Sequence, residues 1–151
     1  MTHMAYEYQV QRVVEFSETD MAGIVHFTNF FRYMEQAEHA FYRSLGMSVM
    51  MEDSGRTISW PRVSASCDYK KPLRFEDIFE IRMSVKEKRT KSIVYQFEFY
   101  KIESKAGPLA EPEVVAVGEL AVVCVQKDGD GGMKSIEIPT AISGLIDVAP
   151  A

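Results

Sequence analysis

The chain has few cysteines, no excess of basic residues and no long hydrophobic run. Its two cysteines, Cys67 and Cys124, are too few for a disulfide framework and match no metal-ligand spacing, so we expect buried, reduced thiols. The longest strictly apolar stretch, Leu120 to Val125, is far shorter than the ~20 residues of a membrane-spanning helix. We therefore expect no membrane span. Because no apolar signal-peptide region follows Met1, we also expect a cytoplasmic location.

Charge and composition narrow the classes of protein further. The 22 acidic and 17 basic residues give a net charge of −5, so we expect no broad positive field and no nucleic-acid partner. Hydrophobic residues make up 46%, and 9 Phe, 7 Tyr and 1 Trp exclude disorder as the main state. No internal repeat or linker divides the sequence, and its 151 residues predict a single domain over 1–151.

Hydrophobic periodicity predicts five strands. Apolar and polar residues alternate over 6–16, 60–69, 79–86 and 93–99, which is typical of strands with one buried face. The nearly continuous apolar run over 114–126 indicates a central strand covered on both faces.

One long helix is predicted between the first two strands. Apolar residues three or four positions apart form a single helical face: Phe30, Met34, Ala37, Phe41 and Leu45. Thr28 or Asn29 is the expected N-cap and Gly46 the expected stop, which gives a helix of about 18 residues. A second, short helix is expected over 139–146.

This order of elements predicts an α+β fold. One helix cannot cover five long strands, so a sheet wrapped round the helix is the natural arrangement, with its other face covered by another subunit. We therefore expect an oligomer.

The loop over 17–28 is the first candidate for chemistry. It contains the carboxylate of Asp20 and the imidazole of His26, and it ends at the predicted helix N-terminus. Unpaired N–H groups at such a terminus can stabilise an oxyanion, and a nearby carboxylate can attack a carbonyl or activate water. The alternative is that Asp20 caps a turn and His26 packs in the interior.

Residues 16–30 read Phe16-Ser-Glu-Thr-Asp-Met-Ala-Gly-Ile-Val-His-Phe-Thr-Asn-Phe. This run resembles the signature of hotdog-fold thioesterases, above all the 4-hydroxybenzoyl-CoA thioesterase family, whose motif is approximately D-x-x-G-x-V-x-[HY]-x-N-Y. Asp20, Gly23, Val25 and Asn29 match it, and Phe30 replaces the last aromatic residue. A second block also resembles the family: Cys67-Asp68-Tyr69 followed by Pro72, Leu73 and Asp77.

The resemblance implies a hotdog fold, an antiparallel five-stranded sheet wrapped round one long central helix. It also implies hydrolysis of an acyl-CoA to a free acid and CoA, without a metal or cofactor, by a homodimer or homotetramer. Asp20 would be the nucleophile or the general base, and the backbone N–H of Phe27 the oxyanion donor. His26 would orient the substrate or simply pack. Gly23 and Asn29 would contact the substrate.

Two further groups of residues are candidates for substrate binding. The resemblance implies that the basic cluster of Lys88, Arg89 and Lys91 holds the phosphates of CoA, serving a site on a neighbouring subunit; the alternative is a solvated hairpin tip. Ser64 and Ser66, on the polar face of one strand, are candidates for the acyl pocket. A weaker basic group is formed by Lys70, Lys71 and Arg74.

Two other activities stay open. A hotdog dehydratase or hydratase would use His26 with Asp20 for proton transfer, and a non-catalytic protein would only bind acyl-CoA. A calcium site at Asp128-Gly-Asp130 is not expected, because Pro139 occupies the position where such a loop needs a bidentate glutamate.

Overall fold

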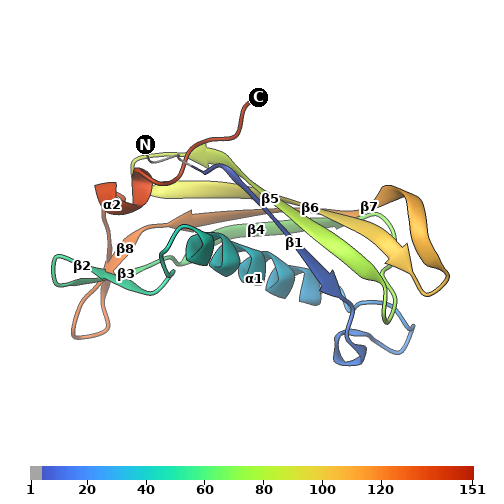
Figure 1. The fold of residues 1–151 in the computed structure, drawn as a ribbon. Helices are drawn as coiled ribbons and strands as arrows, with labels where there is room; N and C mark the ends of the chain where they lie inside the picture. Colours follow the sequence, from blue (N-terminus) through green and yellow to red (C-terminus); the bar gives the residue numbers. More distant parts are fainter. Residues whose placement is uncertain (1–4) are drawn as a thin grey trace.

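The computed structural model describes residues 5–151 of the chain (Figure 1). Its main element is a five-stranded antiparallel sheet with the order β1-β5-β6-β7-β4. The strands are β1 (Glu7–Val13), β4 (Arg62–Tyr69), β5 (Ile78–Lys88), β6 (Ser92–Ser104) and β7 (Gly107–Val123). One long helix, α1 (Asn29–Ser44), lies along one face of this sheet. The predicted α+β arrangement of five antiparallel strands and one helix is therefore confirmed.

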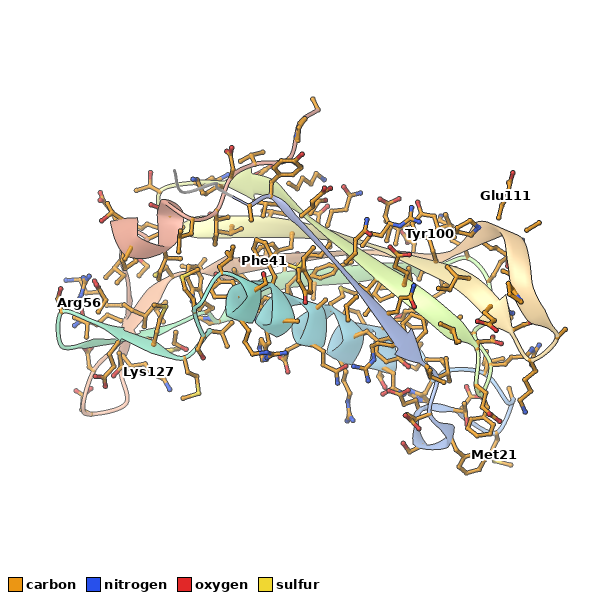
Figure 2. The ribbon with its side chains drawn as sticks, in the orientation of Figure 1. Met21, Phe41, Arg56, Tyr100, Glu111 and Lys127 are labelled. Atoms are coloured by element: carbon orange, nitrogen blue, oxygen red, sulfur yellow. The ribbon has the colours of Figure 1, made fainter. Side chains whose placement is uncertain are left out.

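The main core lies between α1 and the sheet. On β5 and β6 every second side chain over most of the strand is buried, as the alternating patterns predict. Cross-strand partners such as Ile81 and Phe99 therefore build one continuous apolar face. Phe41 of α1 lies between the helix and this face (Figure 2), where its ring meets Tyr95 edge-on with 6.5 Å between ring centroids.

The helix differs from its prediction in length and capping. It has 16 residues and ends at Ser44, and its buried stripe also includes Tyr33, Tyr42 and Glu38. Thr28, one of the two predicted candidates, is the N-cap residue, but its side chain makes no capping hydrogen bond, because both candidate side chains bond elsewhere. Thr28 Oγ1 lies 2.7 Å from Nδ1 of His26, and Asn29 Nδ2 donates to the Glu18 carbonyl at 2.8 Å.

The structure also contains a second, smaller sheet that the sequence patterns do not predict. It has the order β2-β3-β8-β9 and contains β2 (Met51–Asp53), β3 (Arg56–Ser59), β8 (Val125–Lys127) and β9 (Met133–Ser135). These strands have only three or four residues each, too few for a period to be read. The strand predicted over 114–126 is therefore divided at Cys124 between β7 and β8.

The predicted burial of that strand on both faces is wrong for a single chain. Along the second half of β7, buried residues alternate with half-buried ones. The half-buried residues of the outer face include Val117 and Ala121. No other strand or helix covers these side chains within residues 5–151, and Glu119, paired with Lys86, lies between them on the same face.

The two ends of the molecule carry different structures (Figure 1). The second sheet and the short helix α2 (Thr140–Ser143), which was predicted, lie at one end. The loop over 14–28, with the 3-10 turn η1 (Phe16–Glu18), lies at the other, and Met21 marks its tip in Figure 2. No helix within residues 5–151 is both long and apolar enough to cross a membrane.

Candidate active site

The loop before α1 is held by backbone hydrogen bonds to the segment that precedes β5. Val25 donates to the carbonyl of Leu73 at 2.8 Å, and Ile24 forms an antiparallel bridge with Arg74. Within the loop, Thr19 and Val25 form a second bridge. The loop is thus a small ordered hairpin rather than a free connection, and it presents residues 20–23 at its turn.

Asp20 begins this turn and stabilises it with one carboxylate oxygen. Its Oδ1 accepts from the amide of Ala22 at 2.8 Å and from that of Ile24 at 3.4 Å. Gly23 closes the turn with a positive φ of 79°, a conformation that other residues rarely adopt. The turn-capping interpretation is therefore true of Oδ1 alone. Oδ2 accepts no hydrogen bond from residues 5–151, so it is available to a substrate or a water molecule.

Asp20 lines a cavity of about 610 Å³, a volume in the usual range for small-molecule sites. Most of the wall is apolar or aromatic, and a few polar residues are present. The lining residues are Asp20, Ala22, Ile24, Val25, Phe27, Phe30, Tyr69, Lys71, Pro72, Leu73 and Arg74.

Phe27 lines the same cavity. Phe27 lies in the turn before α1, and among the described residues its amide N–H has no acceptor. Its carbonyl accepts from the Tyr69 hydroxyl at 3.1 Å, and the two rings meet edge-on. Two residues of one cavity wall thus each have a polar group without a partner in the described chain, the Oδ2 atom of Asp20 and the N–H of Phe27 just before α1.

Residues 14–146 match the family model described as the thioesterase-like superfamily. The chain belongs to this superfamily. The hotdog thioesterase resemblance of residues 16–30 is confirmed, and with it the assignment to the thioester hydrolases.

Named relatives and solved structures agree with this membership. The chain is 25% identical to 4-hydroxybenzoyl-CoA thioesterase of Pseudomonas sp. (strain CBS-3) over 138 residues, 90% of this chain and 94% of the relative. It is 27% identical over 140 residues to 1,4-dihydroxy-2-naphthoyl-CoA hydrolase of Thermosynechococcus vestitus, covering 93% and 88%. A crystal structure of a hypothetical protein from Aquifex aeolicus superposes with a TM-score of 0.78 at 30% identity, covering 93% of this chain and 99% of that one.

The fold of this chain is also similar to that of a thioesterase solved with a bound ligand. The structure of a 4-hydroxybenzoyl-CoA thioesterase mutant complexed with 4-hydroxybenzoyl-CoA superposes with a TM-score of 0.78 at 22% identity, covering 95% of this chain and all of that one.

In the present chain, His26 and Asn29 do not line the cavity with Asp20. The Nδ1 atom of His26 lies 3.3 Å from the Thr28 amide, which donates to it, and 2.7 Å from the Thr28 hydroxyl. Asn29 donates to the carbonyl of Glu18, eleven positions earlier, and so ties the start of α1 to the loop. Gly23 lines two neighbouring hollows rather than this cavity. In this structure these three residues shape the loop.

The predicted serines also lie apart from the cavity. Ser64 and Ser66 are exposed on β4, the edge strand of the main sheet, and neither lines the cavity. Of the weaker basic group, Lys71 and Arg74 line the cavity, and Lys70 does not.

The basic cluster lies at the opposite end of the sheet from Asp20 (Figure 1). β5 has 11 residues, or about 35 Å of extended chain, between the loop's end of the sheet and this cluster. Lys88, predicted as a contact of the CoA phosphates, is already hydrogen-bonded within its own chain. Its Nζ donates to the carbonyls of Ser143 and Ile146 at 3.1 and 2.6 Å and thereby holds α2. Arg89 pairs with Glu87 at 2.6 Å, and Lys91 is exposed.

Glu18, which the sequence patterns do not indicate, holds the loop through polar contacts. Glu18 accepts from the amide of Glu15 at 2.8 Å and lies 3.8 Å from the guanidinium of Arg12. Burial, and then the Glu18 carboxylate, raises the pKa of Tyr33 well above its usual value, so its hydroxyl stays protonated. No cluster of His, Cys, Asp or Glu side chains within 5–151 is arranged to hold a metal ion.

Proposed function

We propose that this thioesterase hydrolyses acyl-CoA to a free acid and CoA, with Asp20 as the catalytic carboxylate and the backbone N–H of Phe27 as the oxyanion donor. One observation carries the proposal: the unshared Oδ2 of Asp20 and the unshared amide of Phe27 belong to residues that line one cavity. A thioester carbonyl in that cavity would meet a nucleophile or base and an oxyanion donor together.

Two routes use the same groups. In one, Oδ2 attacks the carbonyl carbon, the CoA thiolate leaves, and water hydrolyses the mixed anhydride. In the other, Asp20 removes a proton from water as the water attacks, and the thiolate leaves from the tetrahedral intermediate. In both routes the negative charge that develops on the carbonyl oxygen is stabilised by the Phe27 amide.

The test is a panel of acyl-CoA substrates with three readouts: free thiol, the structure of the acyl chain, and binding. A thioesterase releases thiol, whereas a hydratase alters the chain and keeps the thioester intact. A non-catalytic acyl-CoA-binding protein does neither. The hydratase alternative has little support, because His26 does not line the cavity with Asp20. Chain alteration or binding without thiol release would contradict the proposal.

We also propose a homo-oligomer, at least a dimer, with the active site at the subunit interface. β4 is an edge strand whose residues are mostly exposed, including Val63 at 62% and Tyr69 at 46%. An unpaired edge bearing apolar side chains is unfavourable in water and is covered well by a second copy.

Light scattering at micromolar concentration is therefore expected to give at least twice the chain mass of 17.2 kDa. Whether the assembly is a dimer or a tetramer follows from the same measurement. A monomeric mass together with retained activity would contradict this expectation.

For the nucleotide end of CoA we propose Arg89 and Lys91, acting on a site of a neighbouring subunit. Arg89 is 69% exposed, and its pairing with the exposed Glu87 is weak enough to yield to a phosphate. Since charged hydrogen bonds contribute about 1.5–3 kcal/mol, Arg89→Ala is expected to raise KM for acyl-CoA about tenfold or more with kcat nearly unchanged. The matching acyl-pantetheine, which lacks the nucleotide, should be hydrolysed as by wild type. Equal losses on both substrates, or no loss on either, would contradict the assignment.

The cytoplasm is the compartment that we propose for this activity. Both cysteines are free thiols, Cys124 being buried and Cys67 half-buried. A reducing compartment keeps such thiols in this state.

A further inference from the structure

Among the described residues that line the Asp20 cavity and the hollow beside it, Arg74 is the one cation without an ion pair. Three lysines line this cavity or the adjacent hollow of about 440 Å³. Each has a carboxylate within 4 Å: Lys71 has Glu113 at 3.4 Å, Lys101 has Asp77 at 3.2 Å and Lys105 has Glu76 at 3.6 Å. The side chain of Arg74, which lines both spaces, makes no ion pair or hydrogen bond within the part of the chain that the structure describes.

The backbone places Arg74 close to the reacting end of the cavity. Ile24 pairs with Arg74 on one side, and its carbonyl accepts from the Asp20 amide at 2.9 Å on the other. Neighbouring extended segments lie about 4.8 Å apart, so the Cα atoms of Asp20 and Arg74 are about 10 Å apart. An anion held by Arg74 is therefore near the thioester. The phosphates of CoA lie at the far end of the pantetheine arm, well beyond this span.

The apolar part of the cavity wall suits a flat apolar group. Phe30 is 4% exposed, and its ring meets that of Tyr69 edge-on with 5.3 Å between centroids. Pro72 and Leu73 supply further apolar surface in the same cavity. An aromatic ring against these side chains would have its thioester at Asp20, and Arg74 would lie within reach of a substituent on the ring.

We propose that Arg74 is an anion-binding residue of the acyl subsite, which selects the CoA thioester of an aromatic acid carrying a second carboxylate. This inference rests on the proposed thioesterase function. A planar guanidinium binds a carboxylate in bidentate fashion, and Arg74 is exposed and therefore accessible to such a ligand. The carboxylate of the substrate supplies the partner that Arg74 lacks among the residues of its own chain.

The test compares benzoyl and 4-carboxybenzoyl groups, each as the CoA and as the pantetheine thioester. Wild type is expected to prefer the carboxylated acyl group on both carriers. Arg74→Gln should lower kcat/KM for 4-carboxybenzoyl thioesters about tenfold, chiefly through KM, because one charged hydrogen-bonding partner is lost. Both benzoyl thioesters should be hydrolysed as before. Arg74→Lys should retain part of the preference, and the control Lys105→Gln should change nothing.

Each other outcome overturns the inference. A loss that follows CoA rather than the carboxylate would assign Arg74 to a phosphate, and equal losses on all four substrates would assign it to the fold. No loss on any substrate would leave Arg74 without a role in binding. If wild type hydrolyses benzoyl-CoA but rejects 4-carboxybenzoyl-CoA, the inference fails while the proposed function stands. If none of these thioesters releases thiol, and no acyl-CoA of the wider panel does, the proposed function fails as well.

Discussion

Asp20→Asn is expected to lower kcat for the best acyl-CoA substrate by about 10²–10⁴, the usual effect of removing a positioned acid or base. An asparagine side chain keeps an oxygen that can accept from the Ala22 and Ile24 amides, so the turn should keep its shape. It offers neither a base nor a nucleophilic carboxylate. Thiol release measures the loss, while the Kd for acyl-CoA and the Tm should stay near the wild-type values.

The matched control is Asp130→Asn. Asp130 accepts from the Gly132 amide at 3.0 Å in the turn between β8 and β9, so the exchange removes an acid of similar geometry far from the cavity. Its kcat should equal that of wild type. If Asp20→Asn retains more than about a tenth of wild-type kcat, Asp20 is not the catalytic group.

Arg62→Gln is expected to cost about 3 kcal/mol of unfolding free energy at pH 7, because it leaves a buried carboxylate without its partner. Glu38 lies on the buried face of α1 with its side chain only 1% exposed. Arg62 of β4 donates to both its carboxylate oxygens, at 2.6 and 3.1 Å. The value is at the low end for a buried pair, since Arg62 is itself 29% exposed and water can reach the site.

The loss should depend on pH. Burial raises the pKa of Glu38, while Arg62 lowers it, so removing Arg62 raises this pKa further. Protonated Glu38 needs no partner, so the destabilisation is small below the ordinary glutamate pKa of about 4.3 and grows as pH rises through the folded-state pKa. In the wild-type chain, burial lowers the pKa of His39, which lies 3.7 Å from Glu38, so this neighbour adds little positive charge at pH 7. Glu35, the other charged group nearby, has the same sign as Glu38.

Urea unfolding at pH 4 and pH 7 measures both effects. Adding Glu38→Gln to Arg62→Gln removes the stranded charge and should restore much of the stability at pH 7. Equal losses at the two pH values, or no recovery in the double variant, would contradict this account of the pair.

The predictable parts of the fold are those in which one long segment carries its own signal. The alternation of β5 and β6 and the spacing of Phe30, Met34, Ala37 and Phe41 each fix a buried face without knowledge of the rest of the chain. The loop around Asp20 is predictable for the same reason, because its motif is one contiguous run over residues 16–30. The short strands β2, β3, β8 and β9 carry no such signal, because their pairing depends on segments far apart in the sequence.

The unpredicted parts of the site are contacts between distant segments. The hydroxyl of Tyr69 meets the carbonyl of Phe27, 42 positions earlier, and Lys88 meets two carbonyls more than 50 positions later. Every residue has a backbone carbonyl, so the sequence does not indicate which carbonyl these side chains bond. In the sequence, Arg74 stands out only as part of the weaker basic group with Lys70 and Lys71. The cavity wall that it shares with Asp20 arises from the bridge between Ile24 and Arg74.

The most direct test of thioester hydrolysis at the Asp20 cavity is a mass balance in water enriched in ¹⁸O, with an aromatic acyl-CoA as substrate. Wild type is expected to release one CoA thiol for each free acid formed, with oxygen from the solvent in the acid. Asp20→Asn should form both products at least about 100-fold more slowly. Consumption of the acyl-CoA without matching thiol and acid, or full activity of Asp20→Asn, would contradict the account.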